Sequence, residues 1–247
     1  MYKIWYRNFL FFKKTFLVSI FWTVLEPLMF LGALGFGFGR YIPNIEGLSF
    51  LEFYYAGLLC TTVMMVSYFE ATYPNYTKMT HQKTYNTMLL TPINPRQIFN
   101  GEIFWGATKG LIGLLGLFLV SSLFGLYNNK FFILLPTLFL LGLIFSAFGM
   151  IVVSIAKNYD SFVFSTSGVI VPLSVISGTY FSLQEMNSFL KTFAYLFPLA
   201  HAVNIVRSVL YRNVFSNDQL INYMVLVLYF VIFTLIGQKL FAKKLIS

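Results

Sequence analysis

The sequence predicts an all-α membrane protein with six transmembrane helices, an amphipathic interfacial helix at the N-terminus and a re-entrant helical hairpin between the fifth and sixth spans. Of the 247 residues, 58% are hydrophobic and 10% are charged, whereas a soluble domain carries about 25% charged residues. Most of the apolar runs approach the roughly 20 residues with which a helix crosses a bilayer. Because no stretch between them is polar enough to fold separately, we expect residues 1–247 to form a single transmembrane domain.

The first element that we expect is an interfacial helix over residues 1–14. Helical spacing places Ile4, Trp5, Phe9 and Phe12 on one side, among basic residues that favour an anionic leaflet. The alternative interpretation is a basic flank of the first span. The six spans are expected at residues 15–38, 53–73, 98–123, 131–156, 162–176 and 220–241, with a kink at Pro172 in the short fifth span.

Basic residues orient these spans. If both termini are cytoplasmic, eleven Lys and Arg residues lie inside, five lie outside and Lys109 lies within a span. Such a bias predicts that both termini face the cytoplasm. It also accounts for the net charge of +9 without a nucleic-acid partner. The inner residues are Lys3, Arg7, Lys13, Lys14, Lys78, Lys83, Arg96, Lys157, Lys239, Lys243 and Lys244, and the outer ones are Arg40, Lys130, Lys191, Arg207 and Arg212.

Residues 177–210 form an unusual outer segment. The fifth span breaks at Ser177 and Gly178, and two short, half-polar segments follow, divided at Pro198. Segments that are too short and too charged to cross the bilayer must be buried in protein or lie at the interface. Their aromatic residues fit the headgroup level, and they also fit contact with an amphipathic or sugar-bearing substrate. The candidate residues of this outward-facing hairpin are Gly178, Tyr180, Phe181, Phe189, Pro198 and His201.

The longest inner loop, residues 73–97, is expected to hold one helix at 76–90, closed by Pro92 and Pro95. Its mixture of basic, polar and apolar residues suits a docking helix that faces both the membrane and a cytosolic partner. An ordinary solvated connector is the alternative. The candidate contact residues are Lys78, Met79, His81, Gln82, Lys83 and Tyr85.

Four ionisable residues lie within or near the spans, where a charge must face protein, water or a partner. They are Glu26, Glu70, Glu102 and Lys109. Glu102 and Lys109 share a helix face but lie about 10 Å apart by helix rise, so they cannot pair well with each other. Cross-helix pairing with Glu70 is possible. Glu26 precedes Pro27 and could bond a freed backbone group. Structural pairing is favoured over a substrate or proton path, and both interpretations remain open.

No catalytic, cofactor or metal site is expected in this chain. Residues 101–109, GEIFWGATK, have the glycine spacing of a phosphate-binding loop. They lack the Lys-Ser/Thr that follows in a functional loop, and they lie in an apolar span. The two histidines, His81 and His201, are too far apart in sequence for metal-ligand spacing. The chain is therefore not expected to bind ATP through a Walker motif.

Residues 177–207, SGTYFSLQEMNSFLKTFAYLFPLAHAVNIVR, resemble the signature region of type-2 ABC exporter permeases, in particular the NodJ-like branch of nodulation-factor (lipo-oligosaccharide) exporters. LEPLMFLGALGFGFG at 25–39, SYFEATY at 67–73 and GEIFWGATKG at 101–110 agree with the family in the same order. The chain departs from the family at Ser182 and Asn187, where proline is frequent. This departure bears on the rigidity of the loop.

The resemblance implies six spans and a dimer of permeases in a bacterial cytoplasmic (inner) membrane. Two copies of a separate ATPase subunit would hold ATP and magnesium and would contact residues 2–14 and 76–90. The hairpin at about 183–197 would cap the exit of the path. Substrates across the family include lipo-oligosaccharides, polysaccharides and drugs. The competing classes are a stand-alone membrane enzyme that acts on lipid-linked substrates and an ion-coupled carrier.

Overall fold

The computed structural model describes residues 1–42, 44–212 and 217–246, and in these ranges the secondary structure is helical, with one isolated bridge between Ile45 and Leu48. The all-α prediction is confirmed. The helices in chain order are α1 (Tyr2–Lys14), α2 (Phe16–Phe30), η1 (Leu31–Gly37), η2 (Phe38–Arg40), α3 (Phe50–Thr80), α4 (Thr84–Leu89), α5 (Pro95–Leu123), α6 (Phe131–Ile155), α7 (Asp160–Ser165), η3 (Thr166–Ile170), α8 (Val171–Ile176), α9 (Ser188–Tyr195), α10 (Pro198–Arg207), η4 (Ser208–Arg212) and α11 (Asn217–Ile246).

Five helices in the described ranges are long and apolar enough to cross a bilayer: Phe16–Arg40, Phe50–Thr80, Pro95–Leu123, Phe131–Ile155 and Gln219–Leu245. The predicted fifth span falls on Asp160–Ile176, an apolar helix of 17 residues. It spans about 26 Å at 1.5 Å per residue. Pro172 lies at the start of α8, directly after the π-helical η3. Because proline lacks the N–H of the helical ladder, it favours this local widening.

The centre of the bundle is formed by α3, α5 and α6, which pack against one another, while α11 lies against α6 and α2 lies against α5. Burial follows this arrangement: 78% of the most apolar window of α3 is buried, but only 11% of that in Phe16–Arg40 and 17% of that in Gln219–Leu245. The first and last long helices therefore present most of their apolar surface to lipid or to another subunit.

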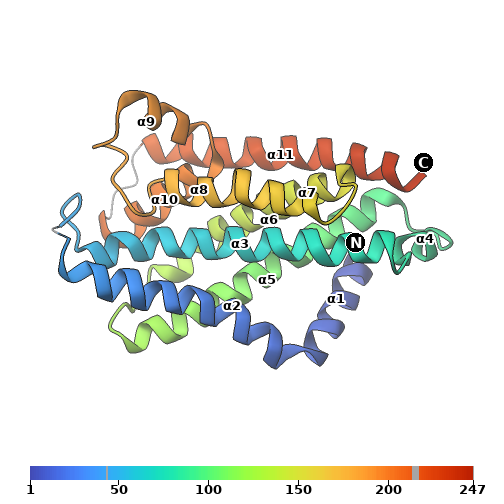
Figure 1. The fold of residues 1–247 in the computed structure, drawn as a ribbon, viewed down its shortest axis with the longest axis horizontal. Helices are drawn as coiled ribbons and strands as arrows, with labels where there is room; N and C mark the ends of the chain where they lie inside the picture. Colours follow the sequence, from blue (N-terminus) through green and yellow to red (C-terminus); the bar gives the residue numbers. More distant parts are fainter. Residues whose placement is uncertain (43, 213–216, 247) are drawn as a thin grey trace.

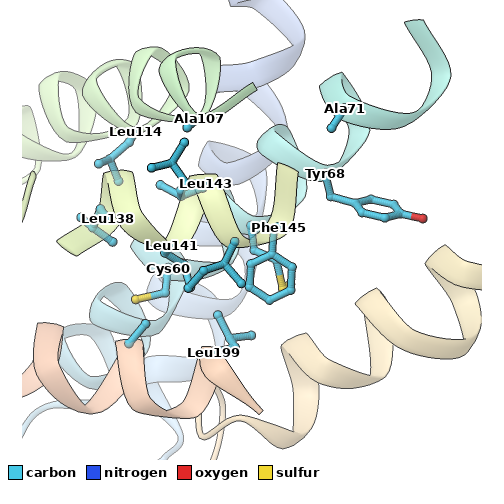
Figure 2. Close-up of a cluster of buried hydrophobic side chains, with 14 of the residues drawn as sticks. Cys60, Tyr68, Ala71, Ala107, Leu114, Leu138, Leu141, Leu143, Phe145 and Leu199 are labelled. Carbon is cyan, nitrogen blue, oxygen red and sulfur yellow. The ribbon is translucent and has the colours of Figure 1, made fainter. Parts of the chain in front are cut away.

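Small residues let the central helices approach closely. A side chain at Gly106 would lie 3.2 Å from the backbone oxygen of Ser67 in α3, and one at Gly149 would lie 2.9 Å from Cβ of Ala71. The GxxxG spacing at Gly106 and Gly110 thus serves packing of α5 within the chain. Figure 2 shows the core between these helices, where Cys60, Ala107, Leu141 and other apolar side chains meet with Leu199 of α10.

The two ends of the bundle differ. At one end, α1, α4 and the C-terminal end of α11 lie together, and α1 runs across the long axis of the bundle (Figure 1). We call this the α1–α4 end. At the opposite end lie α9 and the connection between η2 and α3, and we call this the hairpin end. Helix α1, Tyr2–Lys14, is the separate N-terminal helix that the sequence predicts.

The predicted helix at 76–90 is wrong in its boundaries. Helix α3 continues to Thr80, a turn at 81–83 follows, and α4 begins at Thr84. The extension past Pro74 is stable because Tyr76 and Met79 are buried. The break occurs at Lys83, whose φ of 49° is left-handed; that conformation cannot continue a right-handed helix.

The hairpin has the breaks that the sequence predicts. Gly178 has a φ of +80°, which favours glycine, and α9 and the helix Pro198–Arg212 meet at 93°. Asn187 begins α9 because its side chain accepts a hydrogen bond from the N–H of Phe189. The two arms differ in burial, however: α9 is largely exposed, whereas α10 is almost wholly buried against α3, α6 and α11.

Candidate functional site

The α1–α4 end contains a buried carboxylate that joins three helices. The side chain of Glu102 in α5 is fully buried, and its two oxygens lie 3.0 Å from Nη2 of Arg7 and 2.9 Å from Nζ of Lys78. Nδ2 of Asn8 donates to the same carboxylate at 2.7 Å. A buried carboxylate requires such partners because desolvation of an unpaired charge costs several kcal/mol. Glu102 therefore fixes α1 and the end of α3 to α5.

The local sequence explains why these groups meet. Ile4, Asn8 and Phe12 form the buried face of α1. Gly101 lets α1 approach α5, since a side chain there would lie 2.7 Å from Cβ of Ile4. Asn8 thus comes opposite Glu102. Lys78 reaches the same carboxylate because α3 continues through its last turn.

A second layer connects this joint to α4. Oδ1 of Asn75 accepts hydrogen bonds from Nζ of Lys78 and from the hydroxyl of Tyr85, each at 2.9 Å. Tyr85 is fully buried, and desolvation, followed by the charge of Glu102, raises the pKa of its phenol well above its ordinary value. The phenol therefore stays protonated and acts as the donor in this contact. We call Arg7, Asn8, Asn75, Lys78, Tyr85 and Glu102 the Glu102 joint.

The candidate contact residues of the inner loop divide into two groups. Lys78, Met79 and Tyr85 face the protein interior. His81, Gln82 and Lys83 are exposed in the turn between α3 and α4, where the ring of His81 stacks on that of Tyr159. Leu90, just after α4, is 88% exposed. The sequence did not indicate this surface position, because leucine is apolar. The surface open to a partner is thus the turn and the outer side of α4.

Glu70 and Lys109, two further intramembrane charges, pair with each other. Nζ of Lys109 lies 2.5 Å from Oε2 of Glu70, and Nε1 of Trp105 donates to Oε1 at 2.6 Å. This is the cross-helix alternative that the sequence suggests. Nothing in the sequence indicated that Trp105 would donate the second hydrogen bond to this carboxylate. These contacts agree with the structural interpretation of the two charges.

Glu26 lies apart from these networks. It is exposed and lines a cavity of about 330 Å³ between α2, α3 and α8. Four aromatic residues, Trp22, Phe30, Tyr54 and Tyr180, share this lining with Glu26. The rest of the lining is mostly aliphatic, with hydroxyl-bearing residues of α3 and α8 among it: Thr61, Thr62 and Ser174. The cavity thus offers aromatic faces, hydroxyls and one carboxylate at a single place on the bundle.

The hairpin end is held by Arg207. This side chain is buried, its Nη2 donates to the carbonyl oxygens of Phe53 and Gly178 at 3.1 and 2.8 Å, and its Cζ lies 3.5 Å from the centre of the Phe53 ring. The backbone at Thr179 packs directly on Gly57 of α3. Arg207 therefore clamps the break after α8 onto α3. The sequence assigned Arg207 only to the outer charges and missed this role.

The predicted hairpin residues occupy different environments. Tyr180 packs beside Tyr54, with 5.4 Å between ring centroids, whereas Phe181 and Phe189 are 54% and 74% exposed. Pro198 begins α10 and is buried. His201 is buried, and its ring nitrogens contact Oδ1 of Asn222 at 2.6 Å and the carbonyl of Tyr195 at 2.9 Å. His201 is thus a hydrogen-bonding residue that ties α10 to α11.

Within the described ranges, no group of three or more His, Cys, Asp and Glu side chains is arranged to hold a metal ion. The notable features are a buried charge joint at one end, an amphipathic cavity beside a sparsely buried first span and a clamped hairpin at the other end. These features suit a membrane protein that moves a substrate.

Comparison with known proteins identifies the family. The ABC-2 type transporter family matches residues 1–211. The chain belongs to the ABC-2 type transporter family. As the permease subunit of an ABC exporter, it provides the membrane-spanning transport domain, and permeases of this family pair with ABC ATPase subunits. It is a multi-pass membrane protein, and the resemblance found in the sequence is confirmed.

Relatives of this ABC-2 permease include Nodulation protein J of Rhizobium leguminosarum bv. viciae, with 32% identity over 98% of this chain and 93% of the relative. Nodulation protein J of Rhizobium leguminosarum bv. trifolii is 33% identical over 84% of this chain and 79% of the relative. The inner membrane transport permease YadH of Escherichia coli is 25% identical over 81% and 78%. No solved structure matches the chain significantly.

Proposed function

We propose that this ABC-2 permease exports an amphipathic substrate, such as a lipo-oligosaccharide, a glycolipid or polysaccharide, or a drug, along the face formed by α2, α3 and α8. The observation that carries this proposal is the cavity at Glu26. Its volume of about 330 Å³ lies within the range of small-molecule sites, about 300–1,000 Å³. Aromatic faces suit acyl chains and sugar rings, and hydroxyls with one carboxylate suit sugar hydroxyls or a cationic group.

A second copy of the permease completes this path in our proposal. The cavity lies beside Phe16–Arg40, only 11% of whose most apolar window is buried within the chain. A dimer that covers the face of α2 would enclose the cavity between two permeases. The remaining aromatic surface at the hairpin end, including Phe181 and Phe189, would then lie at the exit or at the headgroup level.

Energy would enter at the α1–α4 end. Two copies of a cytosolic ABC ATPase subunit, which hold ATP and magnesium, would contact α1 and the turn at 81–83 with α4. The Glu102 joint supports this route because it links α1, α3, α4 and α5 through buried hydrogen bonds and ion pairs. A push on α4 would therefore move the ends of two central spans together. A switch between two arrangements of these spans would alternate access to the path.

The basic residues at the α1–α4 end support an orientation of the bundle in the membrane. The α1–α4 end carries most of the basic residues, which predicts that it faces the cytoplasm, with both termini, in a bacterial inner membrane. Tyr180 and the exposed α9 would accordingly face outward. The proposed ATPase contacts and the proposed exit would then lie at opposite ends of one bundle (Figure 1).

The test is substrate-stimulated ATP hydrolysis by the permease reconstituted with the ABC ATPase that co-purifies with it. An acylated oligosaccharide, a glycolipid and a cationic drug are compared as ligands. We expect one class to stimulate hydrolysis and Glu26→Gln to raise the half-stimulating concentration about ten-fold, whereas the exposed Glu185→Gln serves as the control. If no amphipathic ligand stimulates hydrolysis, or if both variants behave alike, the proposed path is wrong.

A further inference from the structure

A second cavity, distinct from the proposed path, lies at the α1–α4 end. It has a volume of about 420 Å³ and lies between α1, the beginning of α2, the end of α3 and α5. Its charged lining residues are Arg7, Lys78 and Lys109 against Glu70. The carboxylate of Glu102, which is buried behind this lining, offsets a second positive charge. The three cations therefore have two carboxylates as counter-charges.

The hydrogen bonds leave part of this positive charge available. Nζ of Lys78 already contacts Asn8, Asn75 and Glu102, which saturates its three N–H groups. Lys109, in contrast, donates to Glu70, whose other oxygen is bonded by Trp105. Within the part of the chain that the structure describes, two N–H groups of Lys109 thus remain for another acceptor. The side chain of Arg7 is 34% exposed, and its guanidinium carries donors beyond those used in the joint.

The remainder of the lining is amphipathic. Phe11 and Phe12 of α1 provide apolar surface, and Thr15, Ser19 and Thr77 provide hydroxyls. Between Thr15 and Ser19, α2 exposes three apolar side chains: Phe16, Leu17 and Val18. A ligand whose anionic group enters the cavity would therefore rest its apolar part on the first turn of α2. The basic amphipathic α1 places this cavity at the level of lipid headgroups.

We propose that this cavity is a binding site for the phosphodiester headgroup of an anionic membrane lipid. Lys109 and Arg7 hold the phosphate, the hydroxyls of Thr15 and Ser19 bond its oxygens or the headgroup alcohol, and the acyl chains lie along α2. The bound lipid would fix α1 against α5 and α3 and thereby stabilise the Glu102 joint. The available donors of Lys109 and Arg7, in a lining where cations outnumber carboxylates, select an anionic headgroup over a zwitterionic one.

The test measures apparent dissociation constants by native mass spectrometry of the full chain in a neutral detergent. The ligands are dioctanoyl phosphatidylglycerol, dioctanoyl phosphatidylcholine and free glycerol phosphate. We expect phosphatidylglycerol to bind about ten-fold more tightly than phosphatidylcholine. The double variant Glu70→Gln/Lys109→Gln, which leaves the net charge unchanged, should reduce this preference to two-fold or less. Lys109→Arg and the exposed Lys13→Gln should retain it.

Three results would overturn the proposal. Equal binding of the two lipids, or loss of the preference in Lys13→Gln to the same extent as in the double variant, would mean that diffuse charge rather than the cavity attracts the lipid. Equal affinity for free glycerol phosphate would assign the phosphate to a soluble ligand. If the double variant aggregates, Ser19→Phe makes the same test, because its ring takes up space in the cavity while Glu70 and Lys109 themselves stay unsubstituted.

Discussion

Replacing Glu102 with glutamine removes the negative charge that Arg7 and Lys78 share in the interior. Loss of one partner of a fully buried ion pair costs about 3–5 kcal/mol. The side chains of Arg7 and Lys78 are 34% and 16% exposed, so water recovers part of this loss. The glutamine oxygen also remains an acceptor for one of them. We therefore expect Glu102→Gln to lower the free energy of unfolding by about 2–3 kcal/mol.

The assay is the apparent melting temperature of the purified permease in a neutral detergent, followed by fluorescence-detected size exclusion. For a chain of this size, about 2–4 °C corresponds to 1 kcal/mol, so Glu102→Gln should melt about 4–12 °C lower. Glu185→Gln, which removes an exposed carboxylate of the hairpin end, is the matched control. In the reconstituted complex, Glu102→Gln should also weaken substrate-stimulated ATP hydrolysis.

A double-mutant cycle with Lys78→Met separates the ion pair from general damage to α5. If the pair exists as described, the double variant is more stable than the sum of the single effects predicts, by about 1 kcal/mol or more. Melting of Glu102→Gln within about 1 °C of the control, or strict additivity in the cycle, would refute the reasoning. Arg7 and Lys78 would then be solvated rather than held by Glu102.

Three further predictions concern other parts of the bundle. Gly149→Ala should lower the melting temperature, because the new Cβ would lie 2.9 Å from Cβ of Ala71. Gly168→Ala, which meets no atom within 4 Å, should leave the melting temperature unchanged. Equal melting of the two variants would contradict the close packing of α3 and α6. In a Cys60→Ala background, Asn187→Cys should react with an impermeant maleimide on intact cells. Labelling only after permeabilisation would mean that the hairpin end faces the cytoplasm, opposite to the proposed orientation. Lys83→Glu should reduce coupled ATP hydrolysis at an unchanged melting temperature, and unaltered coupling would remove the turn at 81–83 from the proposed ATPase contact.

The spans could be predicted because bilayer thickness fixes the length of an apolar run. The starts of the second and third spans were placed late, however. Helix α3 begins at Phe50 and α5 at Pro95, each after a capping box, formed by Ser49 with Glu52 and by Asn94 with Gln97. These pairs are readable signals of a helix start. Hydropathy alone missed them because capping residues are polar and lie outside the apolar run.

The extension of α3 was harder to predict for a different reason. Pro74 and the polar residues after it favour a helix end near residue 73 by local propensity. Burial of Tyr76 and Met79 overrides that preference, and the hydroxyl of Tyr76 bonds the carbonyl of Lys157 at 2.7 Å. Both are tertiary effects, which the local sequence does not contain. The same extension brings Lys78 to Glu102, so the helix boundary and the joint were missed together.

The sequence of α1 nevertheless contained one indication of the Glu102 joint. Helical spacing predicted an apolar face of Ile4, Trp5, Phe9 and Phe12, but the buried residues are Ile4, Asn8 and Phe12. An asparagine between two apolar residues at a spacing of four is costly unless a polar partner lies opposite. The partner, 94 residues away, is an intramembrane acid for which the sequence offered no cross-helix base. Taken together, an unpaired acid in a span and a polar residue on the apolar face of an interfacial helix predict that the two meet, and this argument applies wherever such a helix precedes a span with a buried acid.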